Sequence, residues 1–319
     1  MSTAKRKNRK TTKRGHFWGW VIGCSLVAAL CLLITLGEKM SNPILPTWQE
    51  IFQAVGLAEP QPLDSEMQVH VIDVGNADSI LVRNRGANLL IDAGEKGDGD
   101  TVVSYLRERG VNKLDAVIAT HADADHIGGM AAVLREFEVE RFYMAFMPEE
   151  ATPTTQVYAA MLQALAEQNI EVIEAKPGQQ FSIGDAKVDI LGPAAEFEEN
   201  NNQSVVCKVT FGGRRFLFMG DAEKEAEEAL MASGADLSAD VIKLGHHGSH
   251  SSSQPAFLDR VQAKYALITC GAGNSYGHPH TETLETLRER EMTVYRSDLC
   301  GSIVATTDGS GLSFSTEKE

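Results

Sequence analysis

Cysteine is scarce in this sequence and follows no recognisable motif. The 319 residues contain five cysteines, and none has a partner at the CxxC spacing of thiolate zinc sites. Cys24 and Cys31 lie in an apolar run, which leaves Cys207, Cys270 and Cys300 for the rest of the chain. An odd number without a motif argues against a disulfide framework. We therefore expect these three to pack as small apolar residues.

Basic residues are also scarce outside the N-terminus. Seven of the 29 lysines and arginines lie within the first 14 residues, which contain no acidic residue. The rest of the chain carries 22 basic residues (29 less 7) against 44 acidic ones. This balance argues against a broad phosphate-binding surface, so contact with nucleic acid would need a local basic patch or metal ions.

One apolar run is long enough to cross a membrane. Residues 17–36 carry no charge, and 20 residues match a hydrocarbon core of roughly 30 Å. Because basic flanks stay inside, we expect a cytoplasmic leader at 1–16, a single-pass cell-membrane anchor at 17–36 and an extracellular remainder. A cleaved signal peptide followed by secretion is the alternative. The proline-containing segment 37–66 is expected to be a linker and 67–319 a folded domain.

Strand and helix patterns alternate from residue 67 onward, with hairpins among them. This mixture indicates a layered α/β fold rather than one parallel sheet. Helical periodicity is expected at 101–110, 130–137, 154–168, 222–233, 254–262 and 281–291, and the acidic helix at 222–230 should present a solvated face. Strands are expected at 67–74, 78–83, 88–94, 115–120, 141–147, 187–192, 204–213, 214–221, 240–245, 265–271, 292–296, 301–306 and 311–316.

Histidines and aspartates gather where three of these strands end. The stretch THADADHIGG places four of them within six positions, and that crowding would be costly through repulsion and desolvation unless a cation lay among them. A purely structural alternative exists for Asp221, because an aspartate between strand and helix is commonly an N-cap. The sequence therefore predicts a divalent metal site built from His121, Asp123, Asp125, His126, Asp221, His246 and His247.

The segment HADADHIGG resembles the HxHxDH signature of the metallo-β-lactamase fold. Six motifs, in order, resemble the C-terminal metallo-β-lactamase-like domain of the ComEC competence family: VIDVGNADSILV, LLIDAG, THADADHIGG, FLFMGDAE, DVIKLGHHGSHSSS and NSYGHPHTETLETL. The resemblance covers roughly residues 67–306. It implies an αββα sandwich, with two mixed sheets flanked by helices, behind the N-terminal transmembrane helix. It also implies a metal-dependent hydrolase that holds two divalent ions.

Carried over by position, the resemblance assigns ligands to both ions. His121 and Asp123 would hold the first, and Asp221 would bridge the two. Asp125, His126 and His247 would hold the second, with His246 as the alternative to His247.

The first site departs from the family's pattern. The chain has no histidine from 127 to 245, where the wider fold usually supplies a third one. Asn202 or Ser204 falls at about the right place to substitute, and Asp123 already replaces a histidine. An oxygen-rich site shifts preference from zinc toward manganese, and both remain open.

A two-metal site fits a phosphodiesterase or nuclease. Asp125 is expected to orient the attacking hydroxide, and His278 or His280 to donate a proton or bind a phosphate oxygen. The remaining residues have supporting roles: Ser249, Ser204 and Asn202 as substrate contacts, Asp78 as a support that orients a ligand histidine, and Lys243 as a solvated side chain.

Three functions remain open from the sequence. The first is a phosphodiesterase or nuclease that acts outside the membrane, with DNA as a candidate substrate. The second is hydrolysis of a cell-envelope phosphodiester, such as phosphocholine on a teichoic acid, or of another small ester; the acidic composition favours this over long DNA. The third is a non-catalytic ComEC-like binding module with a degenerate metal site. One membrane segment gives no basis for expecting DNA transport, and no protein partner is inferred.

Overall fold

The structure is a computed structural model that describes residues 31, 32, 34, 35, 66–147 and 152–318. The chain divides into two compact units, Met1–Pro60 and Gln61–Glu319. In the first unit the four described residues are helical. The predicted leader, anchor and linker lie almost entirely outside the described residues. Within the described part of the chain, no helix is long and apolar enough to cross a membrane.

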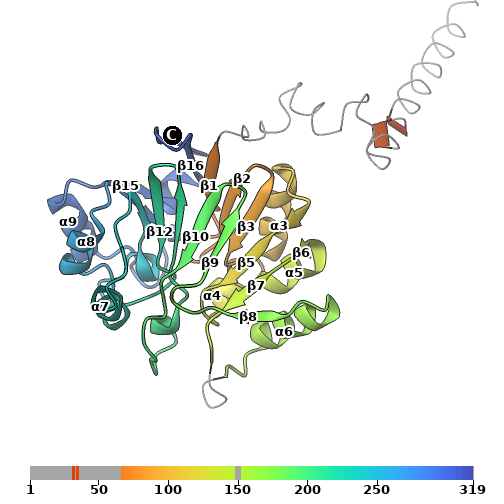
Figure 1. Ribbon diagram of the computed structural model, residues 1–319, viewed down its shortest axis with the longest axis horizontal. Coiled ribbons are helices and arrows are strands. Elements are labelled where there is room, and N and C mark those ends of the chain that lie inside the picture. The colour runs from red at the N-terminus through yellow and green to blue at the C-terminus, as the bar shows by residue number, and fades with distance from the viewer. Residues whose placement is uncertain (1–30, 33, 36–65, 148–151, 319) are drawn as a thin grey trace, which may run out of the picture. The chain divides into compact units, whose positions relative to one another are not determined.

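The second unit contains two mixed sheets whose strands cross the middle of Figure 1. The eight-stranded sheet has the order β17-β16-β1-β2-β3-β5-β7-β8, and the seven-stranded sheet has the order β15-β14-β13-β12-β11-β10-β9. The first consists of β1 (Met67–Val71), β2 (Ile80–Asn84), β3 (Ala87–Ile91), β5 (Ala116–Ala119), β7 (Phe142–Met144), β8 (Val172–Glu174), β16 (Ile303–Thr307) and β17 (Ser313–Thr316). The second consists of β9 (Gln180–Ile183), β10 (Ala186–Ile190), β11 (Cys207–Phe211), β12 (Arg214–Phe218), β13 (Val241–Lys243), β14 (Tyr265–Ile268) and β15 (Thr293–Arg296).

Helices cover the outer face of each sheet. Beside the eight-stranded sheet lie α3 (Gly99–Glu108), α4 (Ala124–Ile127), α5 (Met130–Glu136) and α6 (Gln156–Glu167). Beside the seven-stranded sheet lie α7 (Lys224–Ala232), α8 (Pro255–Val261) and α9 (Thr281–Glu289). Five short elements complete the described part of the fold: β4 (Lys113–Leu114), β6 (Glu138–Val139), α10 (Ser297–Cys300) and the 3-10 helices η2 (Asn201–Gln203) and η3 (Gly245–Gly248).

Alternating side chains give the strands two apolar faces. In β2, Ile80 and Val82 enter the core between the sheets, whereas Leu81 enters the core under α3 and α5. Successive side chains of a strand point to opposite faces, so two apolar faces require a sheet covered on both sides. The described domain is therefore an αββα sandwich, which confirms the predicted fold class for this part of the chain.

The parallel strands of both sheets determine where the loops that carry the histidines and aspartates lie. Strands β3, β5, β7 and β8 run parallel in one sheet, and β12, β13, β14 and β15 run parallel in the other. Because the carboxyl ends of parallel neighbours meet at one edge, the loops after β5, β12 and β13 can converge there. These are the three loops in which the sequence places its histidines and aspartates.

Two expectations were incomplete or wrong. Strands β8 and β9 were not predicted, because their residues are mostly exposed and form no apolar run. The acidic helix is not wholly a solvated face, because Glu227 is 1% exposed. It lies three residues before buried Leu230, and its carboxylate accepts the backbone N–H groups of Ser253 and Gln254 at 2.5 and 2.9 Å. These contacts explain how an acidic residue is tolerated there.

Candidate metal centre

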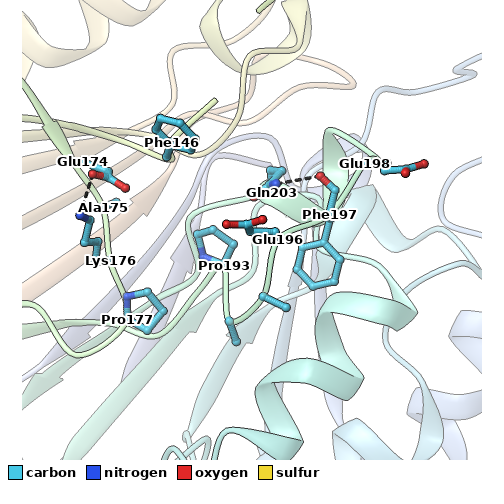
Figure 2. A pocket seen from close by; sticks show the side chains of 12 residues that line it. Phe146, Glu174, Ala175, Lys176, Pro177, Pro193, Glu196, Phe197, Glu198 and Gln203 are labelled. Atoms are coloured by element: carbon cyan, nitrogen blue, oxygen red, sulfur yellow. Dashed lines mark hydrogen bonds and ion pairs between the residues drawn. The ribbon is translucent and has the colours of Figure 1, made fainter. Parts of the chain in front are cut away.

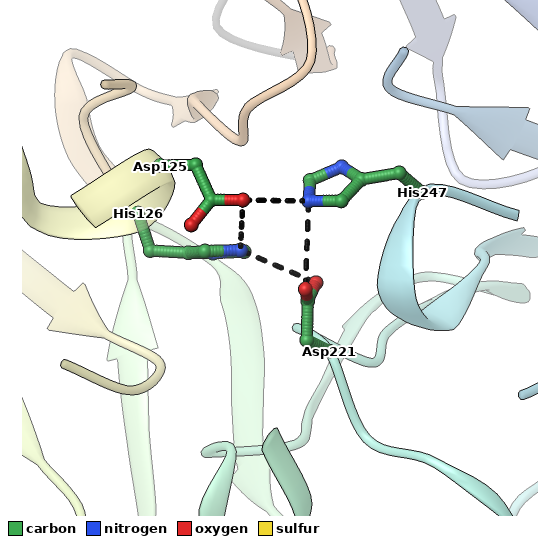
Figure 3. Close-up of side chains that lie close together, drawn as sticks. All are labelled: Asp125, His126, Asp221 and His247. Atoms are coloured by element: carbon green, nitrogen blue, oxygen red, sulfur yellow. Dashed lines mark ion pairs between the residues drawn. The ribbon is translucent and has the colours of Figure 1, made fainter. Parts of the chain in front are cut away.

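Four side chains from three separate loops meet at one point, as Figure 3 shows. Asp125 and His126 lie on α4, which follows β5, while Asp221 follows β12 and His247 follows β13. The His126 Nε2 lies 3.2 Å from Asp221 Oδ1 and 4.0 Å from Asp125 Oδ2. The His247 Nε2 lies 3.4 Å from Asp125 Oδ2 and 3.4 Å from Asp221 Oδ2.

Local backbone constraints hold α4 against the sheet. A Cβ on Gly128 would lie 2.2 Å from the Lys96 backbone nitrogen, and one on Gly129 would lie 2.2 Å from the Ala93 carbonyl oxygen. Only glycine permits this approach. The pair of glycines after His126 therefore lets the ligand-bearing turn lie directly on the loop after β3.

The loop after β13 has an unusual backbone. His246 and His247 adopt φ values of 46° and 52°, a left-handed conformation that costs a residue with a Cβ of order 1 kcal/mol or more. The Nδ1 atom of His247 is 2.8 Å from the Thr269 carbonyl oxygen. That contact helps to hold the strained turn with the His247 Nε2 facing the cluster.

The atoms that face the centre lack ordinary partners. The Nε2 atoms of His121, His126 and His247, together with Asp221 Oδ1, are buried and have no hydrogen-bond partner of acceptable geometry. Buried polar atoms are almost always satisfied. Imidazole nitrogens and carboxylate oxygens are ligands for Zn²⁺ and Mn²⁺, so this donor set fits a divalent metal.

The opposite side of His126 is held by a buried carboxylate. Its Nδ1 lies 2.8 Å from Asp92 Oδ2. The same carboxylate accepts hydrogen bonds from the backbone N–H and the hydroxyl of Thr120, at 2.8 and 2.7 Å. An Nδ1–H donated to Asp92 leaves the Nε2 lone pair of His126 for a metal. The sequence analysis did not single out Asp92, although an aspartate ending an apolar strand in LLIDAG was the available signal.

Within the cluster, neighbouring charges shift the pKa values in the direction opposite to the effect of burial. Burial alone lowers the pKa of an imidazole, but the carboxylates of Asp221 and Asp92 raise the pKa of His126 well above its usual value. Burial also lowers the pKa of His247, and Asp221 outweighs it to give a pKa of about 9. Burial raises the pKa of Asp221, yet His247 and His126 hold it well below its ordinary range. The cluster thus stabilises positive charge, as a metal site must.

The altered first site is more open. His121 Nε2 lies 3.5 Å from Asp123 Oδ2, and the Asp123 side chain is 48% exposed. Asn200 donates a hydrogen bond to Asp123 Oδ1 at 2.6 Å. Ser204 Oγ lies 3.4 Å from His121 Nδ1 and accepts the Asp221 backbone N–H at 3.0 Å. The amide that reaches this site is therefore that of Asn200, which the sequence analysis missed.

Asn202, by contrast, bonds to the chain that follows Asp221. Its Oδ1 accepts the backbone N–H of Glu223 at 3.0 Å, and its amide lies 3.5 Å from a Glu225 carboxylate oxygen. That Asn202 takes the place of the missing histidine ligand, and that it contacts substrate, both stay predictions.

The two neighbouring histidines differ in position. His247 is 1% exposed and reaches two carboxylates at 3.4 Å, as described above. His246 places its Nδ1 2.7 Å from Glu223 Oε1, while its Nε2 is 4.0 Å from Asp221 Oδ2. The geometry favours His247 as the ligand and leaves His246 beside the centre.

The rim of the centre contains His278, whereas His280 lies further out. The His278 ring is 5.3 Å from that of His246, and its Nδ1 is buried without a hydrogen-bond partner. His280 precedes α9, and its Nδ1 lies 2.8 Å from the Nδ1 of exposed His250. Ser249 is buried, with its hydroxyl 2.9 Å from that of Ser251. Of the predicted catalytic residues, Asp125 thus belongs to the four-residue cluster, and the His278 ring lies 6.3 Å from that of His247.

Residues 72–271 match the family model described as the metallo-beta-lactamase superfamily. The chain belongs to this superfamily. This fold is that of a family of metal-dependent hydrolases, and the donor set above agrees with a metal site. The sandwich is also similar to that of the metallo-beta-lactamase fold protein YhfI from Bacillus subtilis, with a TM-score of 0.54 and 15% identity over 76% of this chain and 100% of that one.

Two curated relatives confirm the resemblance to ComEC-type competence proteins. The chain is 35% identical over 300 residues to ComE operon protein 3 of Bacillus subtilis, and 30% identical over 284 residues to competence protein ComA of Neisseria gonorrhoeae. Each match covers 87% of this chain but 38% of the relative. The chain therefore corresponds to well under half of either protein.

A cleft of about 630 Å³ lies among residues at or after the ends of β7, β8 and β10. Figure 2 shows Phe146, Glu174 and Lys176 on one side of it, and Glu196 and Phe197 on the other. Strands β5, β7 and β8 are parallel neighbours, and adjacent strands lie about 4.8 Å apart. The end of β8 is thus about 10 Å from the end of β5, the strand that His121 and α4 follow.

We expect Asp92→Asn to weaken metal binding by about 10- to 100-fold, the usual effect of removing a carboxylate that orients a ligand histidine. The new amide can still accept the Thr120 N–H, but its NH₂ group would face the His126 Nδ1 and favour the tautomer that protonates Nε2. Isothermal titration of metal-stripped protein with Zn²⁺ or Mn²⁺ measures the effect.

The matched control for that experiment is Asp185→Asn, since the side chain of Asp185 is 53% exposed and pairs with Arg85 on the surface. Equal metal affinities for both variants would show that Asp92 does not orient His126.

Proposed function

We propose that this chain hydrolyses phosphodiesters at a centre that holds two divalent metal ions. The observation that carries the proposal is the convergence of Asp125, His126, Asp221 and His247. In that group the Nε2 atoms of His126 and His247 and the Oδ1 of Asp221 are buried without a hydrogen-bond partner. When bound, two divalent ions supply an activated water at neutral pH and stabilise both oxygens of an in-line displacement at phosphorus.

The proposed ligands divide around Asp221. His121 and Asp123 would hold one ion, and Asp125, His126 and His247 would hold the other. The two oxygens of Asp221 face different imidazoles, with Oδ1 3.2 Å from His126 Nε2 and Oδ2 3.4 Å from His247 Nε2. Both imidazoles belong to the second ion, so these distances support Asp221 as a ligand of that ion, and its bridging role is carried over from the resemblance to the ComEC family. The carboxylate and amide groups of the first site favour manganese there, with zinc as the alternative.

Two further side chains have proposed roles in the reaction. Asp125 has a side chain that is 33% exposed, in contrast to the buried Asp221, so its free oxygen can accept a hydrogen bond from the attacking water. His278 lies at the rim with an unsatisfied Nδ1. That nitrogen can bind a phosphate oxygen or donate a proton to the leaving group.

Hydrolysis of bis-p-nitrophenyl phosphate by the purified protein, with Mn²⁺ and Zn²⁺ supplied separately, tests the activity. We expect the Asp125→Ala, His126→Ala double variant to lose at least about 10³-fold in kcat/KM, because metal-held water and its orienting carboxylate are both removed.

Asp185→Ala is the control, since Asp185 is exposed, pairs with Arg85 on the surface and lies outside the cluster. Undiminished turnover by the double variant would exclude the proposed centre. Bound metal without turnover in the unaltered protein would favour the non-catalytic binding module.

DNA and a cell-envelope phosphodiester are the two proposed substrate classes. The name of one of the two relatives, competence protein ComA, refers to competence, which supports DNA. The cleft supports the second class, because it combines two phenylalanines with three glutamates. Lys176 is paired with Glu174 at 2.8 Å. Such a surface repels a polyanion and suits an alkylammonium group, which aromatic faces and carboxylates both attract.

A matched pair of esters separates these classes. p-Nitrophenyl phosphodiesters with a trimethylammonium-ended arm and with a tert-butyl-ended arm have nearly the same shape and differ in charge. For an ammonium-binding cleft we expect a kcat/KM at least about tenfold higher for the charged ester, consistent with about 1–2 kcal/mol for a cation at a partly desolvated aromatic site. The arms should span two to six methylenes, to cover the distance to the cleft.

Glu196→Gln should reduce that preference, and Glu228→Gln is the control because Glu228 is an exposed residue of α7. Equal rates for the two esters, together with inhibition by linear DNA, would favour DNA as the substrate.

We also propose that residues 17–36 anchor the chain in the cell membrane, with residues 67–319 outside. The uncharged run and the basic leader support this. Resistance of the full chain to carbonate extraction from membranes, and release of a 67–319 variant, is the expected result. Extraction of the full chain would contradict the anchor.

A further inference from the structure

A second group of possible metal ligands lies behind the first. One atom each of Asp78, Asp92 and His126 lies within 4.8 Å of the others, and all three residues are buried. His126 belongs to both groups: its Nε2 faces Asp221 at 3.2 Å, and its Nδ1 faces Asp92 at 2.8 Å. We call the group of Asp78, Asp92 and His126 the inner site, and the group of Asp125, His126, Asp221 and His247 the outer site.

A lysine ammonium already lies against the inner site. The Lys243 side chain is 0% exposed and its Nζ contacts Asp78 Oδ2 directly. The same Nζ donates to the Gly220 carbonyl oxygen at 3.1 Å and lies 3.9 Å from Asp221 Oδ1. The prediction that Lys243 is solvated was therefore wrong. Its strand, β13, lies inside the sheet between β12 and β14, and the carboxylate of Asp78 compensates the buried charge.

The other oxygen of Asp78 is also engaged. Asp78 Oδ1 accepts the Thr269 hydroxyl at 2.5 Å and lies 3.5 Å from His247 Nδ1. Lys243 thus links a carboxylate in the turn between β1 and β2 to the turn that carries Asp221 after β12. These two turns belong to different sheets, so the contacts of one ammonium join the sheets beneath the outer site.

These carboxylates can be buried only because cationic groups are buried beside them. Asp78, Asp92 and Asp221 are at most 3% exposed, and isolated buried carboxylates are strongly disfavoured. Removing one partner of a buried ion pair typically costs about 3–5 kcal/mol. Without the ammonium, Asp78 and Asp92 would form an uncompensated pair of carboxylates beside an imidazole, a donor set that attracts a divalent cation.

We propose that the Lys243 ammonium occupies the inner site as a permanent cation and thereby confines metal ions to the outer site and the adjoining first site. Asp78 is thus withheld from metal coordination, and His126 binds metal through Nε2 alone. Lys243 is a positioning residue in this scheme, because it acts through Asp78 and the Gly220–Asp221 turn. The inference uses the proposed metal centre but does not depend on the substrate.

Counting bound Mn²⁺ tests the proposal. The metal-stripped full chain is titrated with Mn²⁺, and the free ion is followed by electron paramagnetic resonance. We expect Lys243→Met to bind one ion more than the unaltered protein, and the Lys243→Met, Asp78→Asn double variant to return to the original number. Lys208→Met is the matched control, because Lys208 is also a buried lysine, paired with Asp236 far from the inner site in sequence; it should leave the number of ions unchanged.

The outcomes separate this inference from the proposed function. An equal number of ions in the unaltered protein and in Lys243→Met, or an extra ion that persists in the double variant, would overturn the inference alone. Absence of Mn²⁺ binding by the unaltered protein would overturn the proposed centre as well.

Failure of the single variant to fold is also informative. If Lys243→Met unfolds when stripped of metal, recovery of its circular dichroism on addition of Mn²⁺, with no such requirement in the double variant, supports the proposal. Failure to recover at any Mn²⁺ concentration would overturn it.

Discussion

The centre depends on one constraint: the buried carboxylate of Asp221 must be surrounded by cations or hydrogen-bond donors. This carboxylate lies among the imidazoles of His126 and His247 and the ammonium of Lys243, at 3.2 to 3.9 Å. A buried carboxylate is acceptable only where cations or donors surround it. Three different loops must therefore approach Asp221 closely, and the αββα sandwich provides that approach by placing the carboxyl ends of parallel strands from both sheets at one edge.

The centre is arranged in successive layers around the same ligands. Outward lie Asp125 and the half-exposed Asp123, which solvent and substrate can reach. Inward lie Asp92, 2.8 Å from the Nδ1 of His126, and Asp78, 3.5 Å from the Nδ1 of His247. Beneath these, Lys243 supplies a charge that cannot dissociate from the protein. This arrangement explains how an acidic chain can bury several carboxylates at the centre and still fold.

Much of this could be predicted from local pattern. A layered α/β fold followed from alternating apolar runs, the αββα sandwich was implied by the resemblance of the ordered motifs, and the four residues of the outer site were all among the predicted ligands. Asn200 was missed because three consecutive asparagines are equivalent in sequence, and only the turn before Ser204 selects the one that reaches Asp123. Lys243 was misassigned because a lysine at a strand end is usually solvated, and its burial depends on strands 20 or more residues away.

The sequence by itself determined which donor types are present, their spacing within each loop and the glycines that allow close approach, because these depend on neighbours along the chain. It also determined that no histidine between 127 and 245 could complete the first site. Only the tertiary structure decided that His247 rather than His246 faces Asp221 more closely, that Asp92 orients His126, and that Lys243 lies beneath the centre. Those three outcomes depend on the packing of two sheets, and no single segment contains the distances that decide them.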